Sequence, residues 1–387
     1  MAVAGRRLRI AVLNRVFAPT GGGAERYSIA LVEQLAQRHE IHVFAQQIDH
    51  HWPGVSYHRI PAPFVRPRWV NQLWYAAATW WATRRGFDLV HSHENTWHGQ
   101  VQTIHVMPVK YNLFHGRSGW AWCFGWLKAL TSPRLLAYLM FERSRLSGVP
   151  SRHRVVVSSA SLRQALAIAY PRSVQIPEVL TPGVQLVGSV SPAQRAAARQ
   201  ELGLPTGGTG LLFVGHDYGK KGLAALLKAM PALPVEVVLM VVGNPTQAAM
   251  FRDLASNLGI VSRVHFLGSL KDISPVFSAA DILVHPTLED TFGMVVLEAM
   301  AHGLPVIVSN EKYCGISALL ADRGNALLLN DPEDVVELGE VLNGLVRDAA
   351  LRLELGQAAI AFARLHDWPA IAAQQDAIYQ AVCERPA

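Results

Sequence analysis

Cysteine is scarce in this chain of 387 residues, and the sequence has no long apolar run. The three cysteines lie far apart and show no metal-ligand spacing; they are Cys123, Cys314 and Cys383. A disulfide framework is therefore implausible, and a reducing cytoplasm is the expected compartment. No stretch approaches the roughly 18 apolar residues that a membrane-spanning helix needs, so we do not expect an integral membrane protein.

The N-terminal stretch 1–18 has a composition like that of a signal peptide, but Arg9 and Asn14 interrupt its apolar run. A strand is the better interpretation of this stretch. Half of the residues are hydrophobic and 17% are charged, which predicts a folded chain with a large core. The length exceeds that of one ordinary domain and predicts two domains.

Charge is divided unevenly between the two halves of the chain. Residues 1–186 hold 21 Lys and Arg against 8 Asp and Glu, a net charge of +13. Residues 187–387 hold 14 Lys and Arg against 21 Asp and Glu, a net charge of −7. We expect the basic half to face an anionic partner, such as a phospholipid surface, a phosphorylated acceptor or nucleic acid.

Strand patterns alternate with helix patterns in both halves. The first half opens with a strand at 8–13, a glycine-rich loop and a helix at about 24–38. The segment 180–195 is rich in Pro, Gly and Ser and has no regular period, so it marks a domain boundary. The alternation then restarts, and the chain ends on an amphipathic helix. This order predicts an α/β protein with two doubly wound, Rossmann-like parallel sheets.

The glycine-rich loop 14–23 connects the first strand to the first helix, a layout that can cradle phosphate groups. Glycines also serve tight turns, and the spacing G-x-G-x-x-G of dinucleotide sites is absent. The loop alone leaves both interpretations open.

The stretch 281–309 has the pattern strand, loop, helix, strand. Two acids, Asp290 and Glu298, are eight residues apart across the loop-to-helix junction. The backbone N–H groups of Gly293 and Met294 would lack intrahelical partners, and with the helix dipole they would bind an anion. A carboxylate one turn further along the helix can hold a sugar diol. Together these features predict a binding site for a nucleotide sugar.

The segment GHDYGKKG places Lys220 and Lys221 after a strand and before a helix. Two cations beside free N–H groups would hold a diphosphate, whereas the alternative is a solvated lysine pair. The predicted anion-binding site at Gly293 and Met294, in the same half of the chain, favours the diphosphate interpretation.

Three histidines are candidates for a site in the first half. His91 and His93 lie on one face of a strand, but no acidic third ligand is evident, which disfavours a metal. His105 ends a short strand at 101–104, at the rim where parallel sheets bind ligands. It is either a site residue or a histidine that merely forms a hydrogen bond at the end of a strand.

Two aromatic segments stand out in the basic half. The segment 69–85 predicts a helix with basic residues at its end, and it most simply covers the sheet. The segment 110–130 combines three tryptophans with Lys110, Arg117 and Lys128, a composition that suits a membrane interface. The alternative is an ordinary segment that caps the core.

Six motifs are spread along nearly the whole chain: GGGAER, TIH, TPGV, VGHDYGKKG, HFLG and EDTFGMVVLEAMAHGLPVI. Together they resemble the motifs of the retaining glycosyltransferases of the GT-B fold. Within that family the chain looks most like the bacterial lipopolysaccharide core glucosyltransferases, through DYGKKG, VVG and SAADILVHPTLED. The resemblance implies two domains that face each other across a cleft. These are an acceptor-side domain at 1–184, with the helix 368–387 packing back on it, and a nucleotide-sugar domain at 185–367.

The resemblance also implies roles for particular residues. Glu298 matches the second acid of the E-x7-E motif, which holds the ribose, and Lys221 matches the lysine that binds the diphosphate. Asp290 stands where the family usually has a glutamate that touches the donor sugar, so either Asp290 or Glu289 makes that contact. The implied catalytic residues are His105, Asp290 and Lys221. The implied donor-binding residues are Gly22, Gly23, His216, Lys220, Lys221, Glu289, Gly293, Met294, Val295 and Glu298.

The implied activity is the transfer of a hexose, with retention, from a UDP- or GDP-sugar to a glycan of the cell envelope, such as a lipopolysaccharide core or a lipid-linked acceptor. The absence of a D-x-D triplet fits an enzyme that needs no metal and no other cofactor. A sugar-nucleotide epimerase, a phosphorylase and a catalytically silent membrane-associated member remain open alternatives. We expect a peripheral location on the inner face of the cytoplasmic membrane, with contact to anionic lipids and not to nucleic acid.

Overall fold

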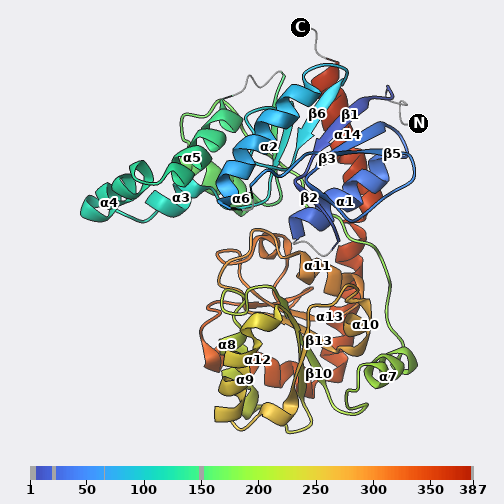
Figure 1. Cartoon of the computed structure of the whole chain (residues 1–387). Coiled ribbons are helices and arrows are strands. Elements are labelled where there is room, and N and C mark those ends of the chain that lie inside the picture. Colours follow the sequence, from blue (N-terminus) through green and yellow to red (C-terminus); the bar gives the residue numbers. More distant parts are fainter. Residues whose placement is uncertain (1–5, 20–22, 65, 148–151, 385–387) are drawn as a thin grey trace. The chain divides into compact units, whose positions relative to one another are not determined.

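A computed structural model of the chain describes residues 6–19, 23–64, 66–147 and 152–384. The chain divides into two units (Figure 1). Unit 1 comprises Met1–Gly183 and Trp368–Ala387, and unit 2 comprises Val184–Asp367.

Unit 1 is built on a parallel sheet of seven strands in the order β5-β3-β1-β6-β7-β8-β9. The central strands β1, β6 and β7 are almost completely buried, as expected for a sheet covered on both faces. The strands are β1 (Arg9–Leu13), β3 (Glu40–Ala45), β5 (Val55–Arg59), β6 (Leu89–Ser92), β7 (Val101–Ile104), β8 (Arg154–Val157) and β9 (Glu178–Val179). A separate parallel pair is formed by β2 (Val16–Phe17) and β4 (Gln47–Ile48).

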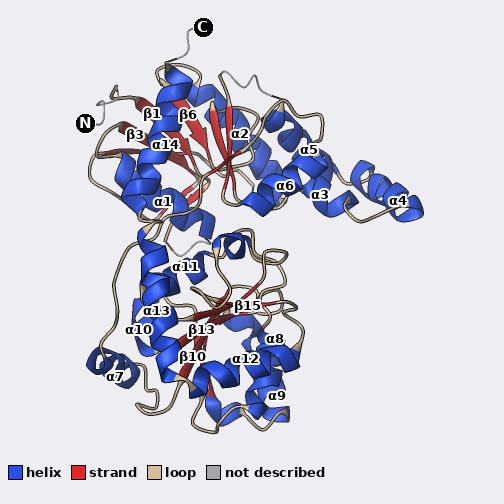
Figure 2. Ribbon diagram, turned by 180° about the vertical axis from the view of Figure 1, so that it is seen from behind, coloured by secondary structure: helices blue, strands red, loops and turns tan. Residues whose placement is uncertain are grey.

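The described part of unit 1 also contains seven helices. Figures 1 and 2 show α1 and the C-terminal helix α14 on one face of the sheet and α2 on the other. In both views α4 lies at the far end of an arm that it forms with α3 and α5, away from the sheet. The helices are α1 (Gly23–Leu35), α2 (Arg68–Thr83), α3 (Val109–Phe114), α4 (Gly119–Leu130), α5 (Pro133–Leu146), α6 (Ala160–Ala169) and α14 (Trp368–Cys383).

Unit 2 is built on a parallel sheet of six strands in the order β12-β11-β10-β13-β14-β15. Its strands are β10 (Gly210–Gly215), β11 (Val238–Gly243), β12 (Val264–Gly268), β13 (Ile282–His285), β14 (Val306–Ser309) and β15 (Leu327–Leu329). Its helices are α7 (Pro192–Glu201), α8 (Leu223–Ala229), α9 (Ala248–Asn257), α10 (Ser274–Ala279), α11 (Met294–Ala301), α12 (Val335–Arg347) and α13 (Ala349–Arg364). Four short 3-10 turns complete it: η1 (Met230–Ala232), η2 (Pro245–Gln247), η3 (Val261–Arg263) and η4 (Gly315–Leu319).

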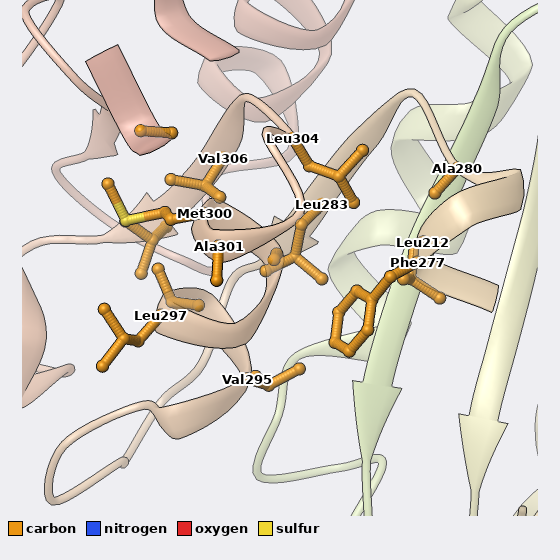
Figure 3. Packing of buried hydrophobic residues seen from close by; sticks show 14 of the residues in the cluster. Leu212, Phe277, Ala280, Leu283, Val295, Leu297, Met300, Ala301, Leu304 and Val306 are labelled. Carbon is orange, nitrogen blue, oxygen red and sulfur yellow. The ribbon is translucent and has the colours of Figure 1, made fainter. Parts of the chain in front are cut away.

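The core of unit 2 has one hydrophobic cluster on each face of the sheet. Leu211 and Phe213 point into the cluster beneath α8, α9 and α12, whereas Leu212 between them points into the cluster beneath α10, α11 and α13. This alternation is the two-residue period of a strand. Figure 3 shows Val295 and Leu297 of α11 within the second cluster, beside β13 and α10. Side chains of α11 are thereby anchored in the core, so the start of the helix is held in place.

These observations confirm the expected fold, two Rossmann-like α/β units, and refine several elements. The aromatic segment 110–130 contains two helices, because α3 ends at Phe114 and α4 begins at Gly119. The apolar stretch 235–242 predicts a strand, and this strand, β11, begins at Val238. The irregular boundary segment runs directly into α7, whose start is fixed by Ser191 in a capping box with Gln194.

Candidate functional site

The order of the strands gives each sheet one topological switch point. In unit 2 the chain begins on β10, builds outward to β11 and β12, and then crosses to β13 on the other side. In unit 1 the same reversal lies between β1 and β6. Ligands of doubly wound proteins bind beyond the carboxyl ends of the strands at such a switch point. A ligand of unit 2 is therefore expected to bind at the loops that follow β10 and β13.

The loops that follow β10 and β13 meet through a lysine and an aspartate. Lys221, in the loop after β10, places its Nζ 2.6 Å from Oδ2 of Asp290, in the loop after β13. The same Nζ donates to the backbone carbonyl of Glu289 at 3.2 Å. The side chains of Lys221 and Asp290 are about one-fifth exposed, so water reaches the pair but does not surround it.

The Asp290 carboxylate is held by two further donors. His285, the fully buried last residue of β13, lies with Nε2 at 3.1 Å from Oδ2 of Asp290. The backbone N–H of Phe292 donates to Oδ1 at 3.3 Å. Burial alone would raise the pKa of Asp290, but the hydrogen bond with His285 and the charge of Lys221 outweigh burial and hold that pKa below its usual range. Asp290 is therefore ionised at neutral pH.

Gly222 lets the two loops of unit 2 pack directly on each other. Its φ is +79°, and a Cβ built on it would lie 1.8 Å from the carbonyl oxygen of Pro286. The backbone N–H of Leu288 donates to the carbonyl of Lys220 at 2.8 Å, which ties the loops together at the same place. A side chain at position 222 would therefore push the lysine loop away from the aspartate loop.

The N-terminus of α11 continues the same site. Gly293 caps this helix in the left-handed region, with φ of +94°, and a Cβ there would lie 2.7 Å from Sγ of Cys314. Met294 and Val295 begin the helix, where backbone N–H groups lack intrahelical partners. Glu298 lies one turn further along α11 and is half-buried. The helix start and both acids of the motif thus lie on one continuous segment.

Three predicted residues lie at the exposed rim of the site. Lys220 pairs with Glu289 at 3.3 Å, and both side chains are at least half exposed, so this ion pair contributes little stability. His216 is exposed in the loop after β10. These three side chains are accessible to a ligand.

One group of side chains within the described residues could hold a metal ion: His285, Asp290 and Cys314. Their possible ligand atoms all lie within 4.8 Å of one another. Cys314 donates its thiol hydrogen to the carbonyl of Phe292 at 3.5 Å, and burial raises the pKa of the thiol. A protonated thiol is a poor ligand. The carboxylate already neutralises the ammonium of Lys221. This donor set suits an ammonium group better than a divalent cation.

A histidine cluster lies at the carboxyl ends of β6 and β7 in unit 1. His105, directly after β7, lies with Nε2 at 3.0 Å from Nδ1 of His93, directly after β6. His91 is fully buried and bonds with Tyr379 of α14 at 2.6 Å and with Thr103 at 2.7 Å. Burial lowers the pKa of His91 and of His105 to about 3. His91 therefore ties β6 to α14 as a neutral structural residue, while His105 lies at the rim.

Arg145 of α5 lies buried beside this cluster. Its guanidinium donates to Gln102 Oε1, Asn95 Oδ1 and the carbonyl of Thr103 at 2.7, 2.9 and 3.0 Å. Burial lowers the pKa of Arg145 to about 10, so it remains cationic at neutral pH. It is a positive charge directly beneath the carboxyl ends of β6 and β7.

The structure brings most of the predicted donor residues together in unit 2, and His105 lies in unit 1. Gly23 is the first residue of α1, and Gly22 lies outside the described residues. The sequence analysis missed His285, Phe292 and Arg145. His285 ends an apolar strand just as His105 does, so the same rule would have found it; the other two have no local signal.

Two family models match adjoining stretches of the chain. One, described as Glycosyltransferase Family 4, matches residues 21–205, and the other, described as Glycosyl transferases group 1, matches residues 194–362. The chain belongs to the glycosyltransferases of the GT-B fold. Within them it is similar to the lipopolysaccharide glucosyltransferase WaaG of Escherichia coli K12, with 30% identity over 250 residues, or 63% of this chain and 66% of that protein.

Other known proteins share the family or the fold. A D-inositol 3-phosphate glycosyltransferase of Corynebacterium kroppenstedtii is 29% identical over 60% of this chain and 54% of its own length. The chain thus matches between half and two thirds of the length of these curated relatives. The crystal structure of WaaG superposes with a TM-score of 0.80 at 23% identity, covering 96% of this chain and 99% of that one. HepE of Anabaena, in complex with UDP and glucose, superposes with a TM-score of 0.73 at 19% identity, covering 96% and 99%.

Proposed function

We propose that the chain is a hexosyltransferase. It moves a hexose from a UDP- or GDP-sugar to a lipopolysaccharide core, a lipid-linked glycan or another acceptor of the cell envelope, with retention of the anomeric configuration. Family membership and the likeness to WaaG support the reaction class. The proposal rests on the ion pair of Lys221 with Asp290 at the switch point of unit 2. Asp290 lies on the same segment as Glu298 of α11.

Each residue of this site has a part in the proposed transfer. As the nucleoside diphosphate leaves, negative charge grows on its phosphate oxygens, and the ammonium of Lys221 and the N–H groups of α11 stabilise that charge. Glu298 accepts hydrogen bonds from the ribose hydroxyls. Asp290 or Glu289 contacts the donor sugar. Side chains supply the positive charge, so the reaction needs no metal.

Retention follows if the acceptor attacks from the face that the diphosphate leaves. The bond between the anomeric carbon and the phosphate oxygen breaks, the bond to the acceptor hydroxyl forms, and the acceptor's proton passes to the departing phosphate. No protein nucleophile takes part in this step. His105 lies on the acceptor side, at the rim of unit 1.

Turnover of labelled UDP- and GDP-hexoses in the presence of envelope glycans tests the proposal. Lys221→Ala and Glu298→Ala should abolish turnover while both variants remain folded by circular dichroism. Lys228→Ala removes an exposed lysine of α8 and serves as the matched control, with unchanged turnover. Wild-type turnover in both site variants would refute the proposed function.

Two other activities of the same fold are separated by one assay. A sugar-nucleotide epimerase consumes a labelled donor when no acceptor is present, whereas a transferase does not. A phosphorylase consumes a glycan with inorganic phosphate. A silent member does neither, and Asp290 in place of the family's glutamate is the feature that keeps this alternative open.

We further propose that unit 1 binds the anionic inner face of the cytoplasmic membrane through α4. On this helix Trp120 is 92% exposed, and Phe124, Leu127 and Leu130 are each more than half exposed. The sequence from 95 to 141 contains no Asp or Glu, while four basic residues accompany the apolar ones: Lys110, Arg117, Lys128 and Arg134. A helix that combines exposed apolar groups with positive charge suits an anionic lipid surface.

The location on the cytoplasmic side is supported by the chemistry of the cysteines. All three are free thiols, and Cys123 on α4 is exposed. Within the described residues, no helix has the length and apolar character that a membrane crossing requires. The contact that we propose is therefore peripheral.

Co-sedimentation with vesicles tests the membrane contact. The wild type should bind vesicles rich in phosphatidylglycerol at low salt, and binding should weaken as salt rises, because the Debye length falls to about 10 Å at 0.1 M salt. Trp120→Ser with Phe124→Ser should abolish binding. Trp80→Ser with Trp81→Ser, two exposed tryptophans of α2, is the matched control. Equal binding to neutral vesicles would contradict the electrostatic part.

A further inference from the structure

The Asp290 carboxylate is fixed from several sides at once. Its Oδ2 faces two nitrogen atoms, Nζ of Lys221 at 2.6 Å and Nε2 of His285 at 3.1 Å. Its Oδ1 accepts from the backbone N–H of Phe292. The backbone of Asp290 is also fixed, because its N–H donates to Tyr313 and its carbonyl accepts from Gly315, at 2.8 and 3.0 Å. Neither the main chain nor the carboxylate is free to turn.

His285 has one polar task in this arrangement. The side chain is fully buried at the carboxyl end of β13, and its Nε2 faces Asp290. Its other ring nitrogen, Nδ1, is buried without a hydrogen-bond partner in the described part of the chain. An apolar side chain of similar size would fill the same space without leaving a buried polar atom unpaired. The polar contribution of this ring is therefore its contact with Asp290.

The contact between His285 and Asp290 helps to hold the side chain of Lys221 in place. Its Nζ bonds to Asp290 and to the carbonyl of Glu289. Its stem runs over the end of β10, where a Cβ on Gly215 would lie 2.8 Å from Cγ of Lys221. A free lysine side chain populates many rotamers, and fixing it before a ligand arrives removes most of that entropic cost from binding. The ammonium is thus fixed at the switch point before a ligand binds.

We propose that His285 is a positioning residue for the transfer. It orients the Asp290 carboxylate, and Asp290 in turn fixes the ammonium of Lys221 where the donor diphosphate binds. The inference rests on the proposed function, since it requires Lys221 to contact a diphosphate. His285 itself touches no substrate.

The test compares two substitutions of His285 in the full chain. His285→Gln keeps an N–H close to the position of Nε2, whereas His285→Leu removes it and keeps the bulk. Calorimetric titration with UDP and with GDP identifies the one that the wild type binds. For that nucleotide His285→Leu should weaken binding about tenfold, the value of fixing one long side chain, and His285→Gln should stay within about threefold of the wild type.

The same substitution in the Lys221→Ala variant distinguishes a positioning role of His285 from a general structural role. In Lys221→Ala the ammonium is gone, so adding His285→Leu should weaken binding no further. His265→Leu replaces a histidine on β12, three strands away from β13, and should bind like the wild type. If His285→Leu does not fold, His285→Asn replaces it, because its shorter amide withdraws the N–H from Asp290.

Each outcome decides the proposal. Wild-type binding by His285→Leu overturns it, and so does equal weakening by His285→Leu and His285→Gln, or a further loss in the Lys221→Ala background. Binding of neither UDP nor GDP by the wild type overturns the proposed function and this inference together. Firm wild-type binding with an unaffected His285→Leu variant leaves the proposed function standing and overturns the positioning role alone.

Discussion

Gly222→Ala probes how closely the lysine loop and the aspartate loop of unit 2 depend on each other. Gly222 has a φ of +79°, and its missing Cβ would lie 1.8 Å from the carbonyl oxygen of Pro286. Alanine at this position therefore meets two separate obstacles. The backbone must hold a left-handed conformation, and the loops must move apart by more than 1 Å to reach a normal contact distance of roughly 3 Å.

The cost of this substitution follows from these two obstacles. A left-handed conformation costs a residue with a Cβ roughly 1–2 kcal/mol. Overpacking against a neighbour that cannot move freely costs about 1–3 kcal/mol. Pro286 cannot move freely, because Leu288 two residues on is bonded to the carbonyl of Lys220. We expect Gly222→Ala to lower the free energy of unfolding of unit 2 by about 2–5 kcal/mol.

Gly219 offers a matched control in the same loop. Its φ is not in the left-handed region, and the nearest atom to a Cβ there is Oδ1 of Asp217 at 3.5 Å, an ordinary contact. Gly219→Ala should change stability by no more than about 0.5 kcal/mol. Urea unfolding, followed by tryptophan fluorescence and circular dichroism, measures both variants. Equal stability of the two would show that the loops are not packed as described.

Two further predictions concern pH. Because the pKa of Asp290 is held below its ordinary value of about 3.9, its ionised form stabilises the folded state at neutral pH, and this contribution is lost as the pH falls below about 4. Asp290→Asn should therefore be less stable than the wild type above pH 5 in urea unfolding, by an amount that shrinks below pH 4; a constant difference would contradict the ion pair. Burial lowers the pKa of His91 to about 3, whereas the pKa of a histidine in the unfolded chain is about 6.5. Below about pH 6.5 the unfolded chain therefore binds a proton that the folded chain does not bind, and the free energy of unfolding decreases. His91→Gln should lessen the loss of stability between pH 6.5 and 4 by up to about 1.4 kcal/mol per pH unit, and an unchanged slope would count against a neutral, buried His91.

The segment around the two acids of unit 2 was the part of the fold most accessible to sequence analysis. The sequence pattern predicts a strand at 282–284, a helix at 294–302 and a strand at 306–308, and β13, α11 and β14 each lie within one residue of these bounds. The prediction succeeds because an apolar strand, a glycine cap and a Gly-Leu-Pro stop are all local signals. Strand β5 was missed, since its residues are mostly exposed and its polar composition shows no clear alternation. Local signals also cannot reveal that α14 packs beside α1.

Individual residues of the candidate site could be predicted from the sequence, but the contacts between their side chains could not. The resemblance to a family singled out Lys221 and Asp290, yet nothing in a spacing of 69 residues shows that their side chains pair directly. The pairing depends on Gly222, whose positive φ and close approach to Pro286 exist only in the folded chain. The partnership of His285 with Asp290 likewise depends on the turn that brings the chain back towards the end of β13.

We propose that unit 2 binds a nucleoside diphosphate through Lys221, and ligand-dependent unfolding tests this proposal directly. At about 100 times its dissociation constant, UDP or GDP should raise the free energy of unfolding of the wild type by about 2.7 kcal/mol. The same concentration should stabilise Lys221→Ala far less. Stabilisation of the wild type by neither nucleotide, or equal stabilisation of the two proteins, would contradict the assignment of Lys221 to the donor diphosphate.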